Sequence, residues 1–309
     1  MNNKNTQDFI LSDRSFEGYK PFKSALAILL TLMFFLALAS ALILGIAVLG
    51  TFYQQDIIDK IAMLSHGYDN FNVYDSTGAL VTLGTIALFI PAMFLATNIT
   101  GYRPFSSYTS VTGKWRTRPF FVCLAVALIV AGIPIVIEST SECNYTGYKF
   151  TLAGLLLCLV LGPLQCIAEE YIFRGLIMQS IGGWINISSI AVLLQAIPFM
   201  FLHPYSSYGM VEVTYSGIIA GFLVYVTGGI EAGSALHIVN NMTLFLMNGL
   251  GYQSIKTNVE LSSLLSTVIV DGIFFAAVFL LKTRTGIFSE DLPKKPYSNK
   301  KIVSEKLSA

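Results

Sequence analysis

Two adjacent glutamates, Glu169 and Glu170, lie inside a stretch of sequence that is apolar enough to be a membrane helix. A carboxylate in a membrane segment is energetically costly, so it marks a functional site by default. Arg174 follows Glu170 by four residues, which allows an ion pair on one helical face. Glu169 lies about 100° round the helix and has no obvious local partner, which suits a general base. The alternative is a buried charge network that only holds helices together.

Two of the three histidines also lie in or beside apolar segments. His203 follows Phe199 by four residues, so an aromatic ring can pack beside its imidazole, although His203 alone is typical of an interfacial residue at a helix end. His237 and Asn241 are also four apart and share one helical face. An imidazole and a carboxamide so placed could donate hydrogen bonds to a developing oxyanion, bind a metal, or bridge helices.

The composition is that of a protein built to lie in a membrane. Of the 309 residues, 54% are hydrophobic and only 12% are charged, with a mean hydropathy of +0.66. A soluble domain carries about 25% charged residues. The net charge of +1 offers no bulk basic character that would attract nucleic acid. The sequence therefore predicts an all-α, polytopic membrane protein and no nucleic-acid partner.

Apolar runs long enough to cross a bilayer, about 20 residues each, recur along the chain. We expect about eight transmembrane helices, over residues 24–53, 79–97, 119–137, from about 150 into the glutamate pair, 187–202, 213–227, 232–250 and 261–281. The expected organisation is a cytoplasmic tail (1–23), a transmembrane domain (24–281) with a catalytic core at about 150–250, and a basic cytoplasmic tail (282–309). The Gly217 and Gly221 pair predicts close packing within the chain.

Charge bias predicts the orientation of these helices. Basic residues are concentrated in both terminal tails and in the loop after the second helix, which holds Arg103, Lys114, Arg116 and Arg118. The loop over residues 54–78 is acidic by contrast. Both termini are therefore expected to be cytoplasmic. Two further acidic residues have no assigned role. Glu231 is expected at a membrane interface, and Asp271 lies deep in the last predicted helix without an assigned partner.

The three motifs are more specific together than singly. Their order is Glu-Glu-x-x-x-Arg, then Phe-x-x-x-His, then His-x-x-x-Asn, each on a separate predicted membrane helix. In this order the chain resembles the CAAX-protease and bacteriocin-processing (CPBP) family of intramembrane endopeptidases, the family of the CAAX prenyl endopeptidase. The motif residues are Glu169, Glu170, Arg174, Phe199, His203, His237 and Asn241.

The resemblance implies hydrolysis of a peptide bond within the membrane. By position, Glu169 would activate water and His203 would help to hold it. His237 and Asn241 would stabilise the oxyanion, and Glu170 and Arg174 would orient the site. An alternative use of the same residues is a Zn2+ site with Glu169, His203 and His237 as ligands and water in the fourth position. The expected substrate is a lipidated protein or small membrane peptide, in the plasma membrane of a bacterium.

Two other classes of protein are compatible with ionisable residues in a membrane. A transporter could use them as a relay, but transporters often have repeated halves, and no such symmetry is seen in this sequence. A non-catalytic bacteriocin-immunity or scaffold protein could keep the fold and bind a peptide. The complete set of motif residues favours the protease.

Overall fold

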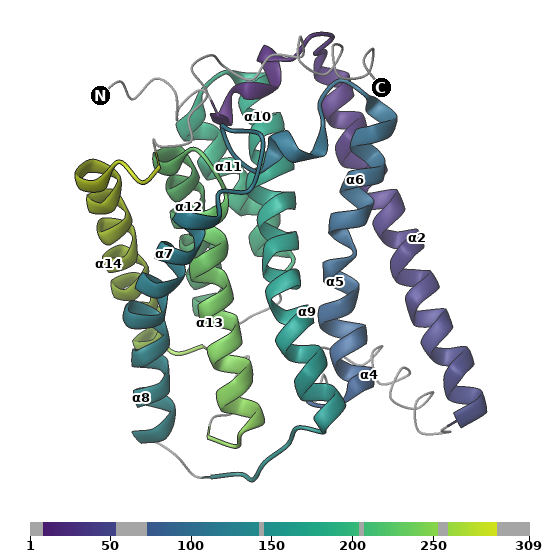
Figure 1. The fold of residues 1–309 in the computed structure, drawn as a ribbon, viewed down its shortest axis with the longest axis vertical. Coiled ribbons are helices and arrows are strands. Elements are labelled where there is room, and N and C mark those ends of the chain that lie inside the picture. Colours follow the sequence, from purple (N-terminus) through teal and green to yellow (C-terminus); the bar gives the residue numbers. More distant parts are fainter. Residues whose placement is uncertain (1–8, 54–72, 142–144, 204–206, 253–258, 289–309) are drawn as a thin grey trace.

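The computed structural model describes residues 9–53, 73–141, 145–203, 207–252 and 259–288, and within these ranges eight helical rods form a bundle (Figure 1). Five rods are single helices: α2 (Pro21–Tyr53), α11 (Ser188–Phe201), α12 (Ser207–Thr227), α13 (Glu231–Gly249) and α14 (Leu261–Thr285). The other three consist of successive helical segments: α4 to α6 (Ser76–Ala79, Thr85–Ala87 and Phe89–Thr100), α7 to α8 (Thr117–Ala127 and Ile133–Ser141) and α9 to α10 (Leu152–Glu170 and Met178–Ile185).

The predicted fold class is confirmed. Six rods in the described part of the chain are long and apolar enough to cross a membrane, and α11 is a shorter apolar helix. Most rods begin and end within four residues of the predicted positions. Two differences are larger, because α12 starts at Ser207 and the fourth rod continues past the glutamates to Ile185. A charged pair buried by neighbouring helices does not end a helix, although it interrupts the apolar run.

The first helix is longer than a bilayer requires. Its 33 residues extend about 50 Å at 1.5 Å per residue, against a hydrocarbon core of about 30 Å. Leu36 and Phe52 are largely exposed on it, as expected of side chains that face lipid. Phe35 stacks on Phe89 of α6 with ring centroids 3.7 Å apart. This contact fastens α2 to the outside of the bundle (Figure 1).

The α9–α10 rod carries the glutamate pair near its middle. Thr151 caps its start by accepting a hydrogen bond from the Gly154 backbone N–H at 3.0 Å. Its end is closed by Asn186 in the left-handed conformation, with φ at 58°. Between α9 and α10, residues Tyr171–Ile177 form a π-helical segment directly after Glu170. Such segments are rare and frequent at functional sites, because they change the direction in which the following side chains point.

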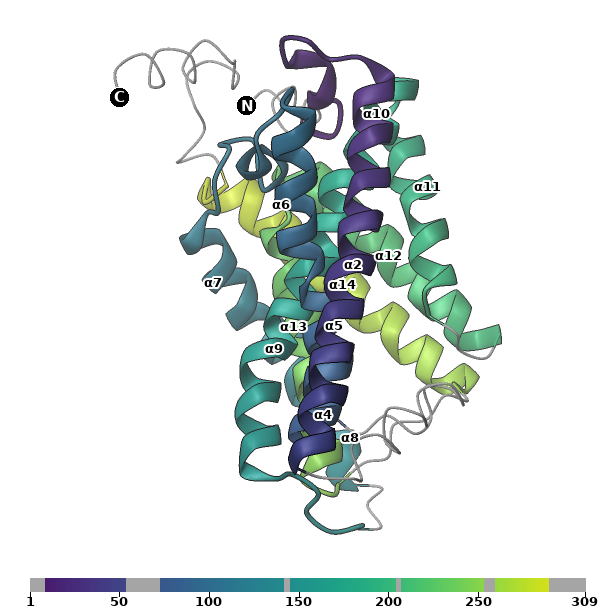
Figure 2. The ribbon, with the colours of Figure 1, turned by 90° about the vertical axis from the view of Figure 1, so that its right-hand side faces the viewer.

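Two apolar clusters pack against the two central helices. One surrounds the glutamate-bearing rod and includes Ala168, Ile172 and Leu176 with residues of α2, α6, α11 and α12. The other joins α7, α13 and α14 and includes Ala235 and Phe274. Helices α9 and α13 contact each other between the two clusters and lie in the middle of the bundle in Figure 1, and Figure 2 shows α2 on the near side of the bundle.

Both described ends of the chain lie at the same end of the bundle, beside the loop over residues 101–116 (Figure 1). Part of the predicted N-terminal tail packs there, because Phe9, Ile10 and Asp13 are buried. Helix α14 continues past residue 281 to Thr285. The remainder of the predicted basic tail, residues 289–309, and most of the predicted acidic loop, residues 54–72, lie outside the described residues.

Candidate active site

The glutamate pair occupies the last turn of α9 and is enclosed by protein. The exposed fraction is 6% for Glu169 and 1% for Glu170 and Arg174. The predicted ion pair is confirmed, because Arg174 Nη1 lies 3.0 Å from Glu170 Oε1. Arg174 Nη2 also donates to the Gly217 carbonyl at 3.3 Å, which ties the pair to α12. An arginine that is buried in this way needs its carboxylate partner to remain buried.

His237 on α13 contacts both glutamates. Its Nδ1 lies 3.1 Å from Glu170 Oε1, and its Nε2 lies 3.5 Å from Glu169 Oε2. An ionised carboxylate only accepts hydrogen bonds, so Nδ1 carries the proton that is donated to Glu170. This bond fixes the orientation of the ring and directs Nε2 at Glu169. The sequence predicted that His237 belongs to the site but did not predict that Glu170 holds it.

Glu169 has a partner that sequence reasoning missed. Gln165, one helical turn earlier, donates from Nε2 to Glu169 Oε1 at 2.6 Å. The signal was present in the sequence, since a polar residue four positions before the glutamate shares its helical face. The second oxygen, Oε2, is buried and has no hydrogen-bond donor in the described part of the chain. Glu169 is therefore held by one oxygen and presents the other towards His237.

Phe199 lies between the two histidines of the site. Its ring centroid is 4.6 Å from that of His203 and 6.4 Å from that of His237. The Arg174 guanidinium lies over the same ring at 4.3 Å, a cation–π distance. His203 Nδ1 is 2.8 Å from the Phe199 carbonyl oxygen. The Phe199 ring therefore contacts residues of all three motifs. His203 itself lies just beyond the end of α11.

Asn241 lies one turn beyond His237 on α13 and faces the last turns of α9. Its side chain lies beside the Cys166 thiol and accepts a hydrogen bond from Asn240 Nδ2 at 3.3 Å. The Cys166 thiol is also 3.7 Å from the His237 carbonyl oxygen. Cys166 precedes the glutamates by about one turn, so Asn241 lies beside the glutamate–histidine cluster. All seven motif residues therefore surround one region of the bundle.

Glycines allow the helices around the site to approach closely. A Cβ atom on Gly217 would lie 3.1 Å from Phe199 Cδ1, and one on Gly221 would lie 2.9 Å from Val192 Cγ1. Both contacts are between α12 and α11 of the same chain. The predicted intramolecular packing of this glycine pair is therefore confirmed.

The zinc alternative requires Glu169, His203 and His237 to converge on one ion. In the ranges that the structure describes, no group of three His, Cys, Asp or Glu side chains is placed to hold a metal. The physical reason is that His203 Nδ1 bonds to its own helix, whereas His237 is turned to the two glutamates. The residues as arranged do not fit the predicted zinc site, and we derive no step through a metal.

Gly233 on α13 sets the distance between α13 and Glu170, and its replacement by alanine should lower turnover. A Cβ atom there would lie 2.9 Å from Glu170 Oε2, so the carboxylate must shift within its buried pocket. Small misplacements of site groups cost up to about a hundredfold in rate, and we expect a fall of about tenfold or more. Gly45→Ala, at a position with no atom within 4 Å of the new Cβ, is the matched control, and the rate of peptide cleavage is the measurement. Equal rates for both variants would show that Glu170 tolerates the shift.

The fold and the site define an all-helical membrane protein with a glutamate–histidine centre enclosed between its helices. Residues 151–243 match the sequence model of the family described as Type II CAAX prenyl endopeptidase Rce1-like. The matched range contains every motif residue from Glu169 to Asn241, so the resemblance indicated by the motifs is confirmed. Over these residues the chain is similar to that family.

A curated relative gives a second, weaker comparison. The chain is 30% identical over 170 residues to a Bacillus subtilis (strain 168) protein with the printed name "Uncharacterized protein YyaK". The aligned region is 50% of this chain and 56% of that protein, so the chain spans about half the length of this relative. No solved structure matches the chain.

Proposed function

We propose that the protein is an intramembrane endopeptidase that hydrolyses a peptide bond near the C-terminus of a lipidated or small membrane-associated peptide. The observation that carries this proposal is the geometry of one oxygen atom. Glu169 Oε2 is buried, lacks a hydrogen-bond donor among the described residues and lies 3.5 Å from His237 Nε2. A water molecule beside these two atoms would have a base on one side and an imidazole on the other.

The reaction would divide the work among six of the seven motif residues. Glu169 accepts a proton from water as the water oxygen bonds to the carbonyl carbon of the peptide. The carbonyl oxygen becomes an oxyanion, which His237 and Asn241 stabilise from one face of α13. The proton then passes from Glu169 to the leaving nitrogen as the carbon–nitrogen bond breaks. His203 helps to hold the water, and Glu170 with Arg174 keeps the imidazole in place.

The membrane location and orientation belong to the same proposal. Both termini are cytoplasmic, in the plasma membrane of a bacterium. The exposed Lys114 and Arg118 and, in the last turn of α14, Lys282 and Arg284 support this orientation. The substrate reaches the site from the lipid, and no nucleic acid takes part.

The test is cleavage of a farnesylated CAAX-type peptide by the purified protein in detergent, with and without a zinc chelator. We expect cleavage that the chelator does not affect. Loss of cleavage in the presence of the chelator would instead indicate a metal-dependent mechanism. Cleavage of an unlipidated membrane peptide alone would indicate bacteriocin-type processing. Binding without cleavage of any peptide would favour the non-catalytic immunity or scaffold protein and contradict the proposal.

Replacing Asn241 by alanine should lower kcat more than it changes KM. A donor that acts on the oxyanion stabilises the transition state and leaves substrate binding nearly unchanged. Loss of one such donor costs about a hundredfold or more in kcat. Asn98→Ala is the matched control, because Asn98 is an exposed asparagine on α6. A rise in KM with kcat preserved would assign Asn241 to substrate binding instead.

A further inference from the structure

One loop contacts both helices that carry the candidate active site. We call residues 101–116 the bridging loop. The Thr109 hydroxyl bonds with the Tyr171 hydroxyl at 2.8 Å, and the Thr109 carbonyl accepts from the Ile230 backbone N–H at 3.0 Å. Tyr171 directly follows Glu170, and Ile230 directly precedes α13, the helix of His237. A single residue of the loop is thus bonded to the two segments whose separation decides the glutamate–histidine contact.

The neighbours of Thr109 reinforce both contacts. On one side, the Phe105 ring stacks on Tyr171 with centroids 4.8 Å apart. On the other side, the Val111 backbone N–H donates to the Gly228 carbonyl at 2.8 Å, in the turn before α13. The loop is therefore packed between the two helices along several residues, not at one point.

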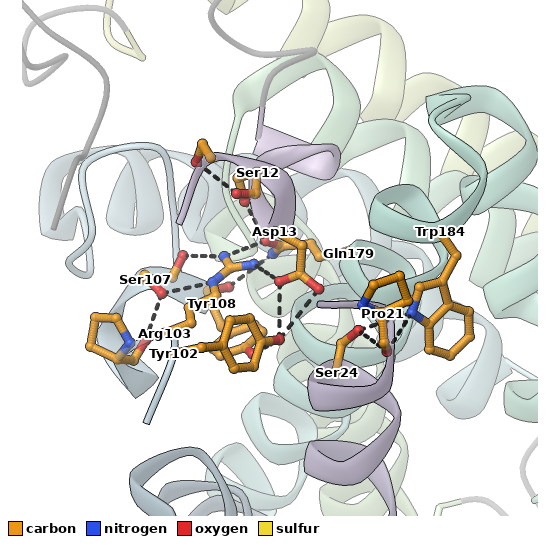
Figure 3. A network of polar contacts seen from close by, with 12 residues as sticks. Ser12, Asp13, Pro21, Ser24, Tyr102, Arg103, Ser107, Tyr108, Gln179 and Trp184 are labelled. Atoms are coloured by element: carbon orange, nitrogen blue, oxygen red, sulfur yellow. Dashed lines mark hydrogen bonds and ion pairs between the residues drawn. The ribbon is translucent and has the colours of Figure 1, made fainter. Parts of the chain in front are cut away.

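Arg103 anchors the first end of the bridging loop, in the buried network of Figure 3. Its Nη1 is paired with Asp13 Oδ1 at 2.7 Å, and its Nη2 donates to Gln179 Oε1 at 2.5 Å. Gln179, on α10, donates in turn to the Tyr108 carbonyl at 3.4 Å and to the Arg174 carbonyl at 3.5 Å. The anchor therefore extends from the N-terminal segment through the loop to the backbone of a site residue.

A tyrosine completes this network. The Tyr102 hydroxyl lies 3.3 Å from Asp13 Oδ1. Burial raises the pKa of the Tyr102 phenol, so the hydroxyl stays protonated and donates to the carboxylate. Asp13 and Arg103 are thus each bonded to more than one group, which is what a buried ion pair requires.

Arg116 anchors the second end of the bridging loop. Its Nη2 is paired with Glu231 Oε2 at 2.7 Å, and its Nε donates to Glu231 Oε1 at 2.9 Å. Both side chains are almost fully buried, and Glu231 is the first residue of α13. A two-point bond between a guanidinium and a carboxylate fixes direction as well as distance. The loop is thereby attached to the start of the helix that carries His237.

We infer that the bridging loop is a positioning element of the active site, which sets the separation of Glu169 and Glu170 from His237. The inference rests on the proposed function for its meaning but on the contacts above for its geometry. Hydrogen bonds weaken steeply with distance, so a small change in the separation of α9 and α13 would alter the His237 contacts. Arg103, Thr109 and Arg116 are the residues that hold the separation, without touching Glu169 or His237 in the contacts described.

The test uses the small number of histidines in the chain. With three histidines in all, protein labelled with ¹³C in histidine gives a spectrum in which the His237 signal is assigned by its loss in His237→Gln. We expect Arg103→Gln and the milder Thr109→Val to shift the His237 signal and its titration. Lys114→Gln removes a positive charge from an exposed position of the same loop and should leave the signal unchanged.

Cleavage kinetics provide the second measurement. For Arg103→Gln, in protein folded at the assay temperature, we expect kcat to fall about tenfold with KM nearly unchanged. Arg103→Lys, which keeps the charge, should recover part of the loss. An unchanged His237 signal and unchanged kcat in folded Arg103→Gln and Thr109→Val would overturn the inference while wild-type cleavage leaves the proposed function standing. If Arg103→Gln shifted the His237 signal but the wild-type protein cleaved no peptide, the inference would stand and the proposed function would be overturned.

Discussion

Glu169→Gln should abolish peptide cleavage and leave the fold intact. The amide has the shape of the carboxylate and can still bond with Gln165, but it cannot accept a proton from water. Loss of a general base costs up to about ten-thousandfold, and we expect turnover to fall about a thousandfold or more. The measurement is the initial rate of cleavage of the farnesylated peptide at saturating concentration, beside a thermal unfolding curve in the same detergent.

A matched substitution separates the loss of a base from the loss of any buried carboxylate. Glu212 on α12 is partly buried and accepts a hydrogen bond from the Thr267 hydroxyl at 2.5 Å, in a contact between α12 and α14 that includes no motif residue. Glu212→Gln makes the same chemical change there and should retain wild-type turnover. If Glu169→Gln retained full turnover, the role proposed for Glu169 would be wrong, whatever the behaviour of Glu212→Gln.

Glu170→Ala should destabilise the protein far more than Glu169→Ala does. Its removal leaves the Arg174 guanidinium buried without a counter-charge and deprives His237 Nδ1 of its acceptor. Breaking a buried ion pair from one side costs about 3–5 kcal/mol. Removing Glu169 leaves the neutral Gln165 amide without its partner and ends the 3.5 Å contact with His237 Nε2, but it leaves no buried arginine unpaired, so we expect a cost of about 1–3 kcal/mol. The melting temperature of Glu170→Ala in detergent should therefore be well below that of Glu169→Ala.

A double variant checks the cause of that loss. Glu170→Ala combined with Arg174→Met removes both charges, so no unpaired ion remains buried. The double variant should recover part of the stability that Glu170→Ala loses, because the effects of substituting the two partners of one ion pair on the free energy of unfolding are not additive. Equal melting temperatures for Glu170→Ala and Glu169→Ala would contradict the pairing argument, as would a double variant less stable than Glu170→Ala.

Local patterns predicted much of the fold and the identity of the site. Apolar length alone located eight rods, because a helix that crosses lipid must be apolar along its length. The four-residue spacing from Glu170 to Arg174 predicted their contact correctly, even though the π-helical segment Tyr171–Ile177 begins between them. The same spacing would have indicated Gln165 as the donor to Glu169. The seven motif residues surround one region, as their order suggested.

Contacts between distant parts of the chain could not be predicted in this way. Arg103 and Arg116 were counted as topological charges, whereas both are buried in ion pairs with residues far along the sequence. Glu231 was expected at an interface and is instead fully buried against Arg116. Asp271 accepts a hydrogen bond from the Ser216 hydroxyl at 2.6 Å. A single sequence carries no signal for such pairing, because charge and hydropathy do not reveal which loop covers which helix.

The total charge of Glu169, Glu170, Arg174 and His237 has a consequence for the proposed reaction. The two glutamates and the Arg174 guanidinium carry one negative charge in total, and the proposed attack leaves the charge of the His237 imidazole unchanged. In the proposed reaction Glu169 takes a proton from water and loses its own charge, and the oxyanion that forms beside it carries the same charge. The charge of the enclosed centre is then the same before and after the attack. A medium that solvates ions poorly would not have to reorganise around a new charge at the moment the bond forms.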